Sequence, residues 1–332
     1  MGAGLVWSTN SEGGYLYSRN LDSKLRYAVE PMCKFRQFAE LRDDPVSNRK
    51  KGDIFTWDVI GPGTTRGGVF SETSTMREGS VIISQGTLTM SQAGLSVPLS
   101  QQLQTMAAFD VEEIIRKSLA LDAVKYFDRA AWAQFNQTPL RVIPTGGTDT
   151  AAVTLTTNGT VTGTNSIAFN SQHAKAITDL MKERNLPAFG GNDYYALAHP
   201  TTLRTVKNNL EMIFQYTPEG LGKILHGEVG RYENVRYLEQ TNIASGVGTT
   251  GFSSTDPGGG DMVPWVNGKS DWIFFIGEDC LTEAIAEAEH LRGDTISNYG
   301  MSKGICWYYI GGMGLTHTVA SNARVVKWDS QA

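Results

Sequence analysis

Residues 110–138 read DVEEIIRKSLALDAVKYFDRAAWAQFNQT, and this stretch predicts the longest helix of the chain. It contains neither glycine nor proline, and its apolar residues recur at spacings of three, four or seven, which is the pattern of one helix face. The residues expected on that face are Ile114, Leu121, Val124, Ala131 and Phe135. A helix of roughly 25 residues would be about 40 Å long.

The two ends of this helix carry boundary signals. Asp110 is placed to act as the N-cap, and Glu113 stands at the capping-box position three residues later. Pro139 follows shortly after the last apolar residue and cannot continue the helix. The expected helix therefore runs from just after Asp110 to about residue 136.

Before the helix, residues 53–99 alternate between apolar and polar side chains. Phe55, Trp57 and Val59 share one side of the first segment, and residues 95–99 alternate again. Residues 61–80 between them are rich in Gly, Thr and Ser. The pattern predicts a long two-stranded arm with a flexible tip. Because an isolated ribbon is marginally stable in water, we expect it to lie on another chain.

After the helix, helical and strand patterns are interspersed, which predicts an α+β fold. Helices are expected at 170–185 with Ser171 as a possible cap, at 201–216 beginning at Thr201, and at 280–291. Strands are expected in YYALAHP (194–200), GEVGRYENVRYLEQTN (227–242), DWIFFIG (271–277) and, as a pair, in GICWYYIGGMGLTHTVASNARVVKWD (304–329).

The bulk composition excludes several classes of protein. The 332 residues are 40% hydrophobic and 19% charged, so the chain is not disordered. A net charge of -5 lacks the basic footprint of a dedicated nucleic-acid binder. No apolar run approaches the roughly 20 residues that span a bilayer, and the N-terminus is not a secretory signal. Three widely separated cysteines suit a reducing cytoplasm.

Motifs for catalysis, cofactors or metals are incomplete. The histidines are isolated in sequence, which disfavours a metal site. EGLGKILHG lacks the Ser or Thr of a phosphate-binding loop, and IASGVG lacks the first glycine of a nucleophile elbow. The sequence therefore predicts no catalytic, cofactor-binding or metal-binding residues and no enzyme. The five histidines are His173, His199, His226, His290 and His317.

The order of parts resembles a known family. An N-terminal arm, a long hairpin, a long helix, a mixed region with a polar insertion and a C-terminal return strand look like the major capsid protein of tailed bacteriophages, which has the Johnson fold. YFDRAAWAQF, ALAHPTTLRTV, GEVGRYENVRYLEQTN and GMGLTHTVASNARVVKW resemble a podovirus-type coat family. In that family a Gly-Glu-(apolar)-Gly turn precedes a strand, here at residues 227–242.

The resemblance implies a division of the chain. The long helix would be the spine helix of the peripheral domain, and the hairpin would be the extended loop that reaches over the adjacent subunit. The implied parts are an N-terminal arm (1–52), an extended β-hairpin loop (53–99), the peripheral domain with the spine helix (100–166), a mainly axial domain (167–305) with a Gly-rich insertion loop (244–268), and C-terminal return strands to the peripheral domain (306–332).

The resemblance also implies a function. The chain would assemble into pentamers and hexamers that form the icosahedral shell around the double-stranded DNA genome of a tailed phage. Its partners would be other copies of itself, a separate scaffolding protein, a portal and a cement or decoration protein, with packaged DNA in non-specific proximity and no membrane. It would be located in the virion capsid and assembled in the host bacterial cytoplasm.

Four residues of the predicted hairpin are candidates for contacts between subunits. Arg66 and Arg77 flank the loop tip and could pair with acidic groups of neighbours. Trp57 and Phe70 are large apolar residues on a ribbon with little core of its own. Such side chains are expected to be buried against a surface outside the ribbon.

Two alternatives remain open at the level of the sequence. An encapsulin-like nanocompartment shell protein of the same fold would enclose a cargo enzyme and carry a groove for a cargo peptide. A soluble enzyme with a His/Asp site assembled in space would show a deep pocket and a small defined oligomer.

Overall fold

The computed structural model describes residues 33–43, 54–63, 67–145, 152–160, 167–190, 192–214, 230–242, 272–293 and 301–328. These residues form three sheets and several helices, so the predicted α+β class is confirmed. The elements are η2 (Arg36–Phe38), β1 (Ala39–Asp43), β2 (Ile54–Gly63), β3 (Val81–Thr89), β4 (Ser91–Ser100), α1 (Gln101–Met106), α2 (Val111–Phe135), β5 (Leu140–Pro144), β6 (Val153–Thr156), α3 (Ser171–Glu183), β7 (Tyr194–Ala198), α4 (Arg204–Phe214), β8 (Arg231–Tyr232), β9 (Val235–Glu239), β10 (Ile273–Ile276), β11 (Leu281–Gly293), β12 (Ser302–Leu315) and β13 (Val325–Trp328).

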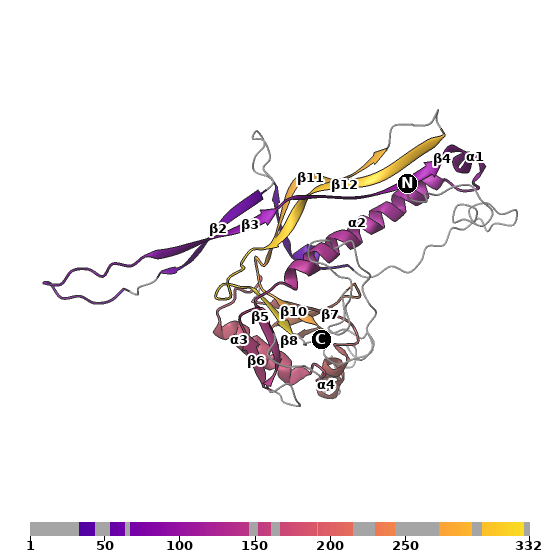
Figure 1. The fold of residues 1–332 in the computed structure, drawn as a ribbon. Coiled ribbons are helices and arrows are strands. Elements are labelled where there is room, and N and C mark those ends of the chain that lie inside the picture. Colours follow the sequence, from indigo (N-terminus) through magenta and orange to yellow (C-terminus); the bar gives the residue numbers. More distant parts are fainter. Residues whose placement is uncertain are drawn as a thin grey trace.

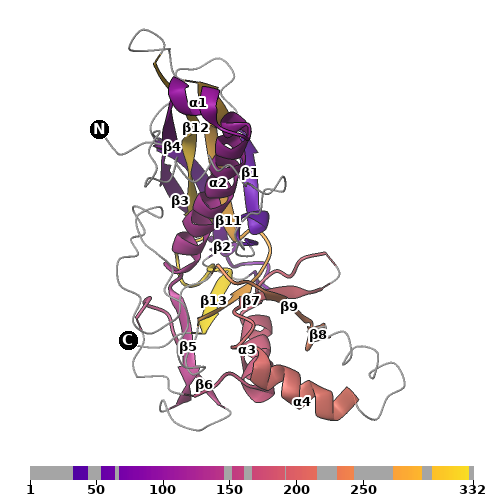
Figure 2. The same cartoon turned by 90° about the vertical axis from the view of Figure 1, so that its right-hand side faces the viewer.

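The upper part of the molecule is a four-stranded sheet with the long helix α2 along it (Figure 1). The strand order is β1-β11-β12-β4, with β1 parallel to β11 and the other pairs antiparallel. Seen from the side, α2 runs lengthwise over the strands of this sheet (Figure 2). The short helix α1 joins β4 to the start of α2.

The spine helix α2 has 25 residues, as the sequence predicts. Asp110 is its N-cap and accepts hydrogen bonds from the backbone N–H groups of Glu112 and Glu113. Arg116 and Lys117 pair with those two glutamates one turn later, which adds small surface contributions.

The predicted apolar face of α2 is partly wrong. Ala131 and Phe135 are buried, but Leu121 and Val124 are 37% and 54% exposed, and Ile114 is half-buried. Most of the buried residues instead recur at every fourth position. This row is Val111, Ile115, Leu119, Ala123, Phe127, Ala131 and Phe135, and Asp128, Trp132 and Ala133 are buried beside it. Four residues advance a helix by about 40° beyond one turn, so this stripe winds around α2 along its length.

The segment 280–291 is a strand and not the predicted helix. Its Ala- and Glu-rich sequence favours helix locally, yet it forms β11 at the centre of the four-stranded sheet. Leu281–Ile285 pairs with β1 on one side, and the strand pairs with β12 along most of its length on the other. Hydrogen bonding on both edges and the burial of Leu281 and Ala284 outweigh the local propensity.

The lower part of the molecule is a seven-stranded mixed sheet in the order β6-β5-β13-β10-β7-β9-β8. Helices α3 and α4 lie together beside it at the bottom of both views (Figures 1 and 2). The expected strands at 194–200 and 271–277 are confirmed as β7 and β10, whose side chains are almost all buried. In the segment 227–242, the alternating residues Val235 and Tyr237 are buried in β9 as predicted.

Several predicted boundaries shift. The N-cap of α3 is Asn170 and not Ser171, because the Asn170 side chain accepts from two backbone N–H groups. Helix α4 begins at Arg204 after a turn at residues 201–203. The C-terminal strands do not pair with each other: β12 lies in the upper sheet and β13 in the lower sheet, so this part of the chain crosses between them. The Gly-rich stretch 244–268 lies outside the described residues.

Residues 33–43 of the expected N-terminal arm pack on the chain's own core. Phe35 is fully buried, with its ring 5.8 Å from the rings of Phe135 and Phe274. The Arg36 guanidinium donates two hydrogen bonds to the buried Glu283 carboxylate and lies 3.9 Å from the Phe127 ring centroid. This segment therefore connects α2 with β11 and β10. Tyr27, another aromatic residue of the expected arm, lies outside the described residues.

Replacing Phe35 with alanine is expected to destabilise the subunit by about 3–5 kcal/mol, because it removes a fully buried ring between two others. Phe38→Ala is the matched control, since Phe38 is only half-buried and should cost less. Denaturant unfolding of the unassembled protein measures both. A negligible loss for Phe35→Ala would show that its ring does not contribute to the core.

Candidate inter-subunit surface

Strands β2 and β3 form a two-stranded ribbon that extends away from both sheets (Figure 1). The predicted hairpin is thus confirmed for these strands, whereas β4, the third alternating segment, joins the four-stranded sheet beside β12. Residues directly opposite in the ribbon share a face, which gives it two distinct surfaces. One carries Trp57 opposite Gly86, and the other carries Ile60 opposite Ile83.

The Trp57 face holds the base of the ribbon against the rest of the chain. The Trp57 indole N–H donates a hydrogen bond of 2.9 Å to the backbone oxygen of Thr316, just beyond β12. Its ring lies over Gly86, where a Cβ atom would be 2.3 Å from the indole Cε2. On the same face, Leu88 is buried. Glycine at position 86 is therefore needed to seat the indole.

The end of β3 packs against glycines of β12. A Cβ atom on Gly312 would lie 2.8 Å from the backbone oxygen of Thr89, and one on Gly314 would lie 3.3 Å from the Leu88 side chain. Side chains at these positions would push the ribbon base off the sheet. The glycine-rich run GGMG (311–314) is thus the surface against which the ribbon base packs.

The distal part of the ribbon exposes apolar side chains. Ile60 is 74% exposed and Ile83, its cross-strand partner, is 65% exposed. Val81 lies two residues from Ile83, so it shares their face and is also exposed. Ile82 is exposed on the opposite face. We call Ile60, Val81 and Ile83 the distal apolar patch. A patch of three aliphatic side chains on so thin an element has no core of its own chain to cover it.

The described part of the ribbon tip is also exposed. Val69, Phe70 and Met76 are all at least half exposed. The Arg77 side chain lies against the backbone at Gly68, because a Cβ atom there would be 2.9 Å from the Arg77 Nη1. The tip therefore combines apolar side chains with a cation.

The four residues predicted to contact neighbours are placed differently. Phe70 and Arg77 lie in the exposed tip, and Arg66 lies outside the described residues. Trp57 contacts its own chain at the ribbon base and is only half exposed. Contact of any of them with a second subunit stays a prediction. The sequence prediction does not include the distal apolar patch, although the apolar run Val81-Ile82-Ile83 beside a Gly-rich loop indicates exposed aliphatic side chains.

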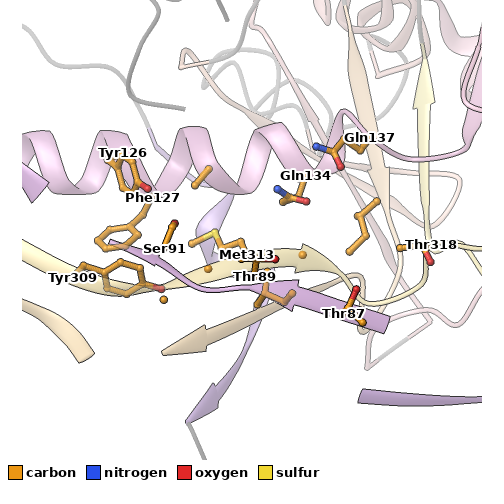
Figure 3. A pocket seen from close by; sticks show the side chains of 16 residues that line it. Thr87, Thr89, Ser91, Tyr126, Phe127, Gln134, Gln137, Tyr309, Met313 and Thr318 are labelled. Atoms are coloured by element: carbon orange, nitrogen blue, oxygen red, sulfur yellow. The ribbon is translucent and has the colours of Figure 1, made fainter. Parts of the chain in front are cut away.

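A cleft of about 690 Å³ lies between the C-terminal half of α2, the ribbon base and the glycine run of β12 (Figure 3). In Figure 3, Gln134 and Gln137 come from the helix side, and Thr87 and Thr89 come from the ribbon. The described lining consists of hydroxyl, amide, aromatic and aliphatic groups together with backbone. It is made of Thr87, Leu88, Thr89, Ser91, Tyr126, Phe127, Ala130, Gln134, Gln137, Tyr309, Gly311, Gly312, Met313, Gly314, Leu315 and Thr318.

The described histidines take part in separate local contacts. His173 closes the capping box of α3, and His290 lies against Tyr308 on β12. His317 and Arg324 both approach the same Asp279 oxygen, at 3.3 and 3.1 Å. Within the described ranges, no group of three or more His, Cys, Asp or Glu residues could hold a metal ion. In the same ranges, no helix is long and apolar enough to cross a membrane.

Comparison with known proteins identifies the fold. No family model and no curated protein matches the chain. The head structure of Helicobacter pylori bacteriophage KHP40 matches with a TM-score of 0.66 at 10% identity, covering 97% of this chain and 98% of that chain. The capsid structure of Cyanophage P-SCSP1u matches with a TM-score of 0.64 at 11% identity, covering 99% and 97%. The capsid of Ralstonia phage GP4 matches with 0.63 at 11% identity, covering 98% and 99%.

These likenesses extend over nearly the whole of each chain and show that this protein has the fold of phage capsid proteins. The predicted Johnson-type architecture is therefore confirmed. The ribbon, the spine helix and the two sheets belong to this fold.

We expect Trp57→Ala and Gly86→Val to loosen the ribbon in the same way, because one removes the indole and the other displaces it. Hydrogen exchange of β2 and β3 should become faster in both variants, while exchange in α3 stays unchanged. Thr56→Val, on the opposite face of the ribbon, is the matched control. Unchanged exchange in the ribbon of Trp57→Ala would mean that the indole does not fix its base.

Gly312→Ala is expected to destabilise the subunit by about 1–3 kcal/mol, because the new Cβ would press on the backbone of Thr89. Gly293→Ala lies in the same sheet, where a Cβ meets nothing within 4 Å, and should be nearly neutral. Thermal unfolding compares the two. A neutral Gly312→Ala would show that the ribbon base can shift without cost.

Proposed function

We propose that this chain is the structural subunit of a phage capsid, which assembles with copies of itself into pentamers and hexamers of an icosahedral shell around double-stranded DNA. The observation that carries this proposal is the distal apolar patch on a ribbon outside both sheets. The near full-length likeness to phage capsid structures supports it. In this function the protein is structural and not an enzyme.

The ribbon is suited to bind a second copy of the chain. Its Trp57 face is used within the subunit, which leaves the distal apolar patch and the tip available to a neighbour. A contact between a ribbon and a different surface of the next copy is heterologous, and such contacts close into rings when the rotation between copies allows it. Five-fold and six-fold rings are the units of an icosahedral shell.

A further apolar surface lies on the spine helix. Leu121 and Val124 are exposed on α2, where a helix of a monomeric protein would normally carry polar residues. We expect these two residues to be covered by a neighbouring copy in the shell. Their exposure supports the use of the subunit in an assembly.

The proposal extends to location and partners. The shell would be part of the virion and would be assembled in the host cytoplasm, with a scaffolding protein, a portal and a decoration protein as expected partners. The net charge of -5 limits attraction between the subunit and packaged DNA. An encapsulin-like compartment would differ in enclosing a cargo protein.

Electron microscopy of the protein expressed alone, and together with the genes encoded beside it, tests this function. Closed shells, or tubes and sheets of five- and six-fold rings, are the expected result. A uniform small oligomer under all conditions would contradict the proposal. Nucleic acid in purified shells supports the capsid, whereas a co-purifying enzyme would support the compartment.

The double substitution Ile60→Asn and Ile83→Asn is expected to reduce shell yield at least tenfold, because it makes the distal apolar patch polar. The fold of the subunit should be unaffected, since both side chains are exposed. Sedimentation measures assembly, and circular dichroism measures the fold. Thr56→Asn with Thr87→Asn, a cross-strand pair on the same face nearer the base, is the matched control.

A further inference from the structure

The face of the ribbon that carries the distal apolar patch also carries a carboxylate. Side chains of a strand alternate between its two faces, so Asp58 lies on the same face as Ile60, two residues further along β2. Asp58 is exposed, and its cross-strand partner Gln85 donates a hydrogen bond of 3.4 Å to it. This face therefore presents a negative charge about 7 Å along the strand from an aliphatic cluster.

The exposed side of the spine helix carries the opposite charge beside aliphatic residues. Lys117, Leu121 and Val124 are spaced by four and three residues, so they form one exposed row on α2, which we call the helix strip. The Lys117 ammonium pairs with Glu113 at 2.7 Å, and its three N–H donors allow it to bind a second acceptor at the same time. The strip presents a cation about 6 Å along the helix axis from Leu121.

The ribbon face and the helix strip do not meet within one chain. The aliphatic residues of both surfaces are exposed. Figure 1 shows the ribbon extending from the body in the direction away from the N-terminal half of α2. The hydrogen bond from Trp57 to Thr316 holds the ribbon base in that direction. A partner for either surface therefore comes from another molecule.

We propose that the distal apolar patch of one copy packs on the helix strip of the next copy, and that Asp58 pairs with Lys117 across this contact. The inference rests on the proposed assembly and names the surface that the ribbon binds. Its basis is the match between the two surfaces. Each is an aliphatic cluster with one charge at a similar distance, and the two charges have opposite signs. Packing two ribbons against each other would leave both carboxylates without an opposite charge and the helix strip exposed.

The contact joins two different surfaces, so it is heterologous. Each copy makes it twice, once through its ribbon and once through its helix strip. An aliphatic core of five side chains is small compared with the roughly 1,000 Å² that a stable pair of proteins buries. Two copies alone therefore bind weakly, and a closed ring, in which every ribbon and every helix strip is used, is favoured over a pair.

Cross-linking between introduced thiols tests the contact. A chain with both Ile83→Cys and Val124→Cys, assembled into particles and treated with a short bismaleimide, is expected to give a ladder of covalent multimers. Each ribbon thiol would lie beside the helix thiol of the next copy. The two single variants and the wild type are the controls, and the linked fraction should exceed theirs at least tenfold. They also account for the native thiols of Cys33, Cys280 and Cys306.

The pattern of cross-links separates the possible arrangements. Dimers from Ile83→Cys alone would show that ribbons pack on ribbons and would overturn the inference. Particles that assemble without a link between positions 83 and 124 would also overturn it, while leaving the proposed function intact. A wild-type chain that forms no shell, tube or ring under any condition would contradict the proposed function and the inference with it.

Exchanging the two charges tests the register of the contact. Asp58→Lys brings like charges together and is expected to lower the yield of particles about fivefold. Adding Lys117→Asp restores an opposite pair and should return the yield to within twofold of the wild type. Asp179→Lys, at an exposed position on α3, is the matched control and should assemble normally. Circular dichroism checks that each variant is folded. A double variant that assembled no better than Asp58→Lys would show that these two residues do not pair.

Discussion

The packing of the spine helix against both sheets is the constraint on which the rest of the molecule depends. Phe127 contacts Tyr309 of the upper sheet, with ring centroids 4.7 Å apart, and Phe135 contacts Phe274 of the lower sheet. One helix can reach both because its buried positions advance by four residues and therefore wind around its axis. The two sheets are thereby fixed relative to one another. Trp132, fully buried and stacked on Trp272, adds to the same junction.

The ribbon belongs to neither of these two sheets and therefore has no core of its own. Its stability within the subunit comes from its base, where the Trp57 indole, Gly86 and the glycine run of β12 fit together. Beyond that base, the exposure of Ile60 and Ile83 costs solvation free energy that only an external surface can recover. A rigid body with one apolar extension suits a protein whose final state is an assembly. In the proposed assembly, the Trp57 face at the ribbon base would attach the ribbon within the subunit, and the distal apolar patch would contact a neighbouring subunit.

The sequence predicts those parts of the fold that depend on local pattern. The spine helix, its cap at Asp110, the ribbon strands and the buried strands β7 and β10 all follow from periodicity and boundary residues. It fails where partners distant in sequence decide the outcome. Segment 280–291 resembles a helix until β1 and β12 pair with its two edges. In the same way, the contact of Trp57 with Thr316 joins residues that no local pattern relates, so the sequence does not predict it.

The N-terminal segment 33–43 is held by two polar contacts of different kinds. Arg36 pairs with Glu283 and Glu289, and its hydrogen bond holds the pKa of Glu289 below the usual range. That ion pair therefore persists through mildly acidic pH. The second contact is the buried Asp128 carboxylate, which accepts hydrogen bonds from Phe35, Gln240 and Asn242 and whose pKa burial raises to about 6. The ion pair joins the segment to β11, and the carboxylate joins it to α2 and to the residues just beyond β9. Because Phe35 lies between Phe135 and Phe274, this segment is itself part of the junction between the spine helix and the lower sheet.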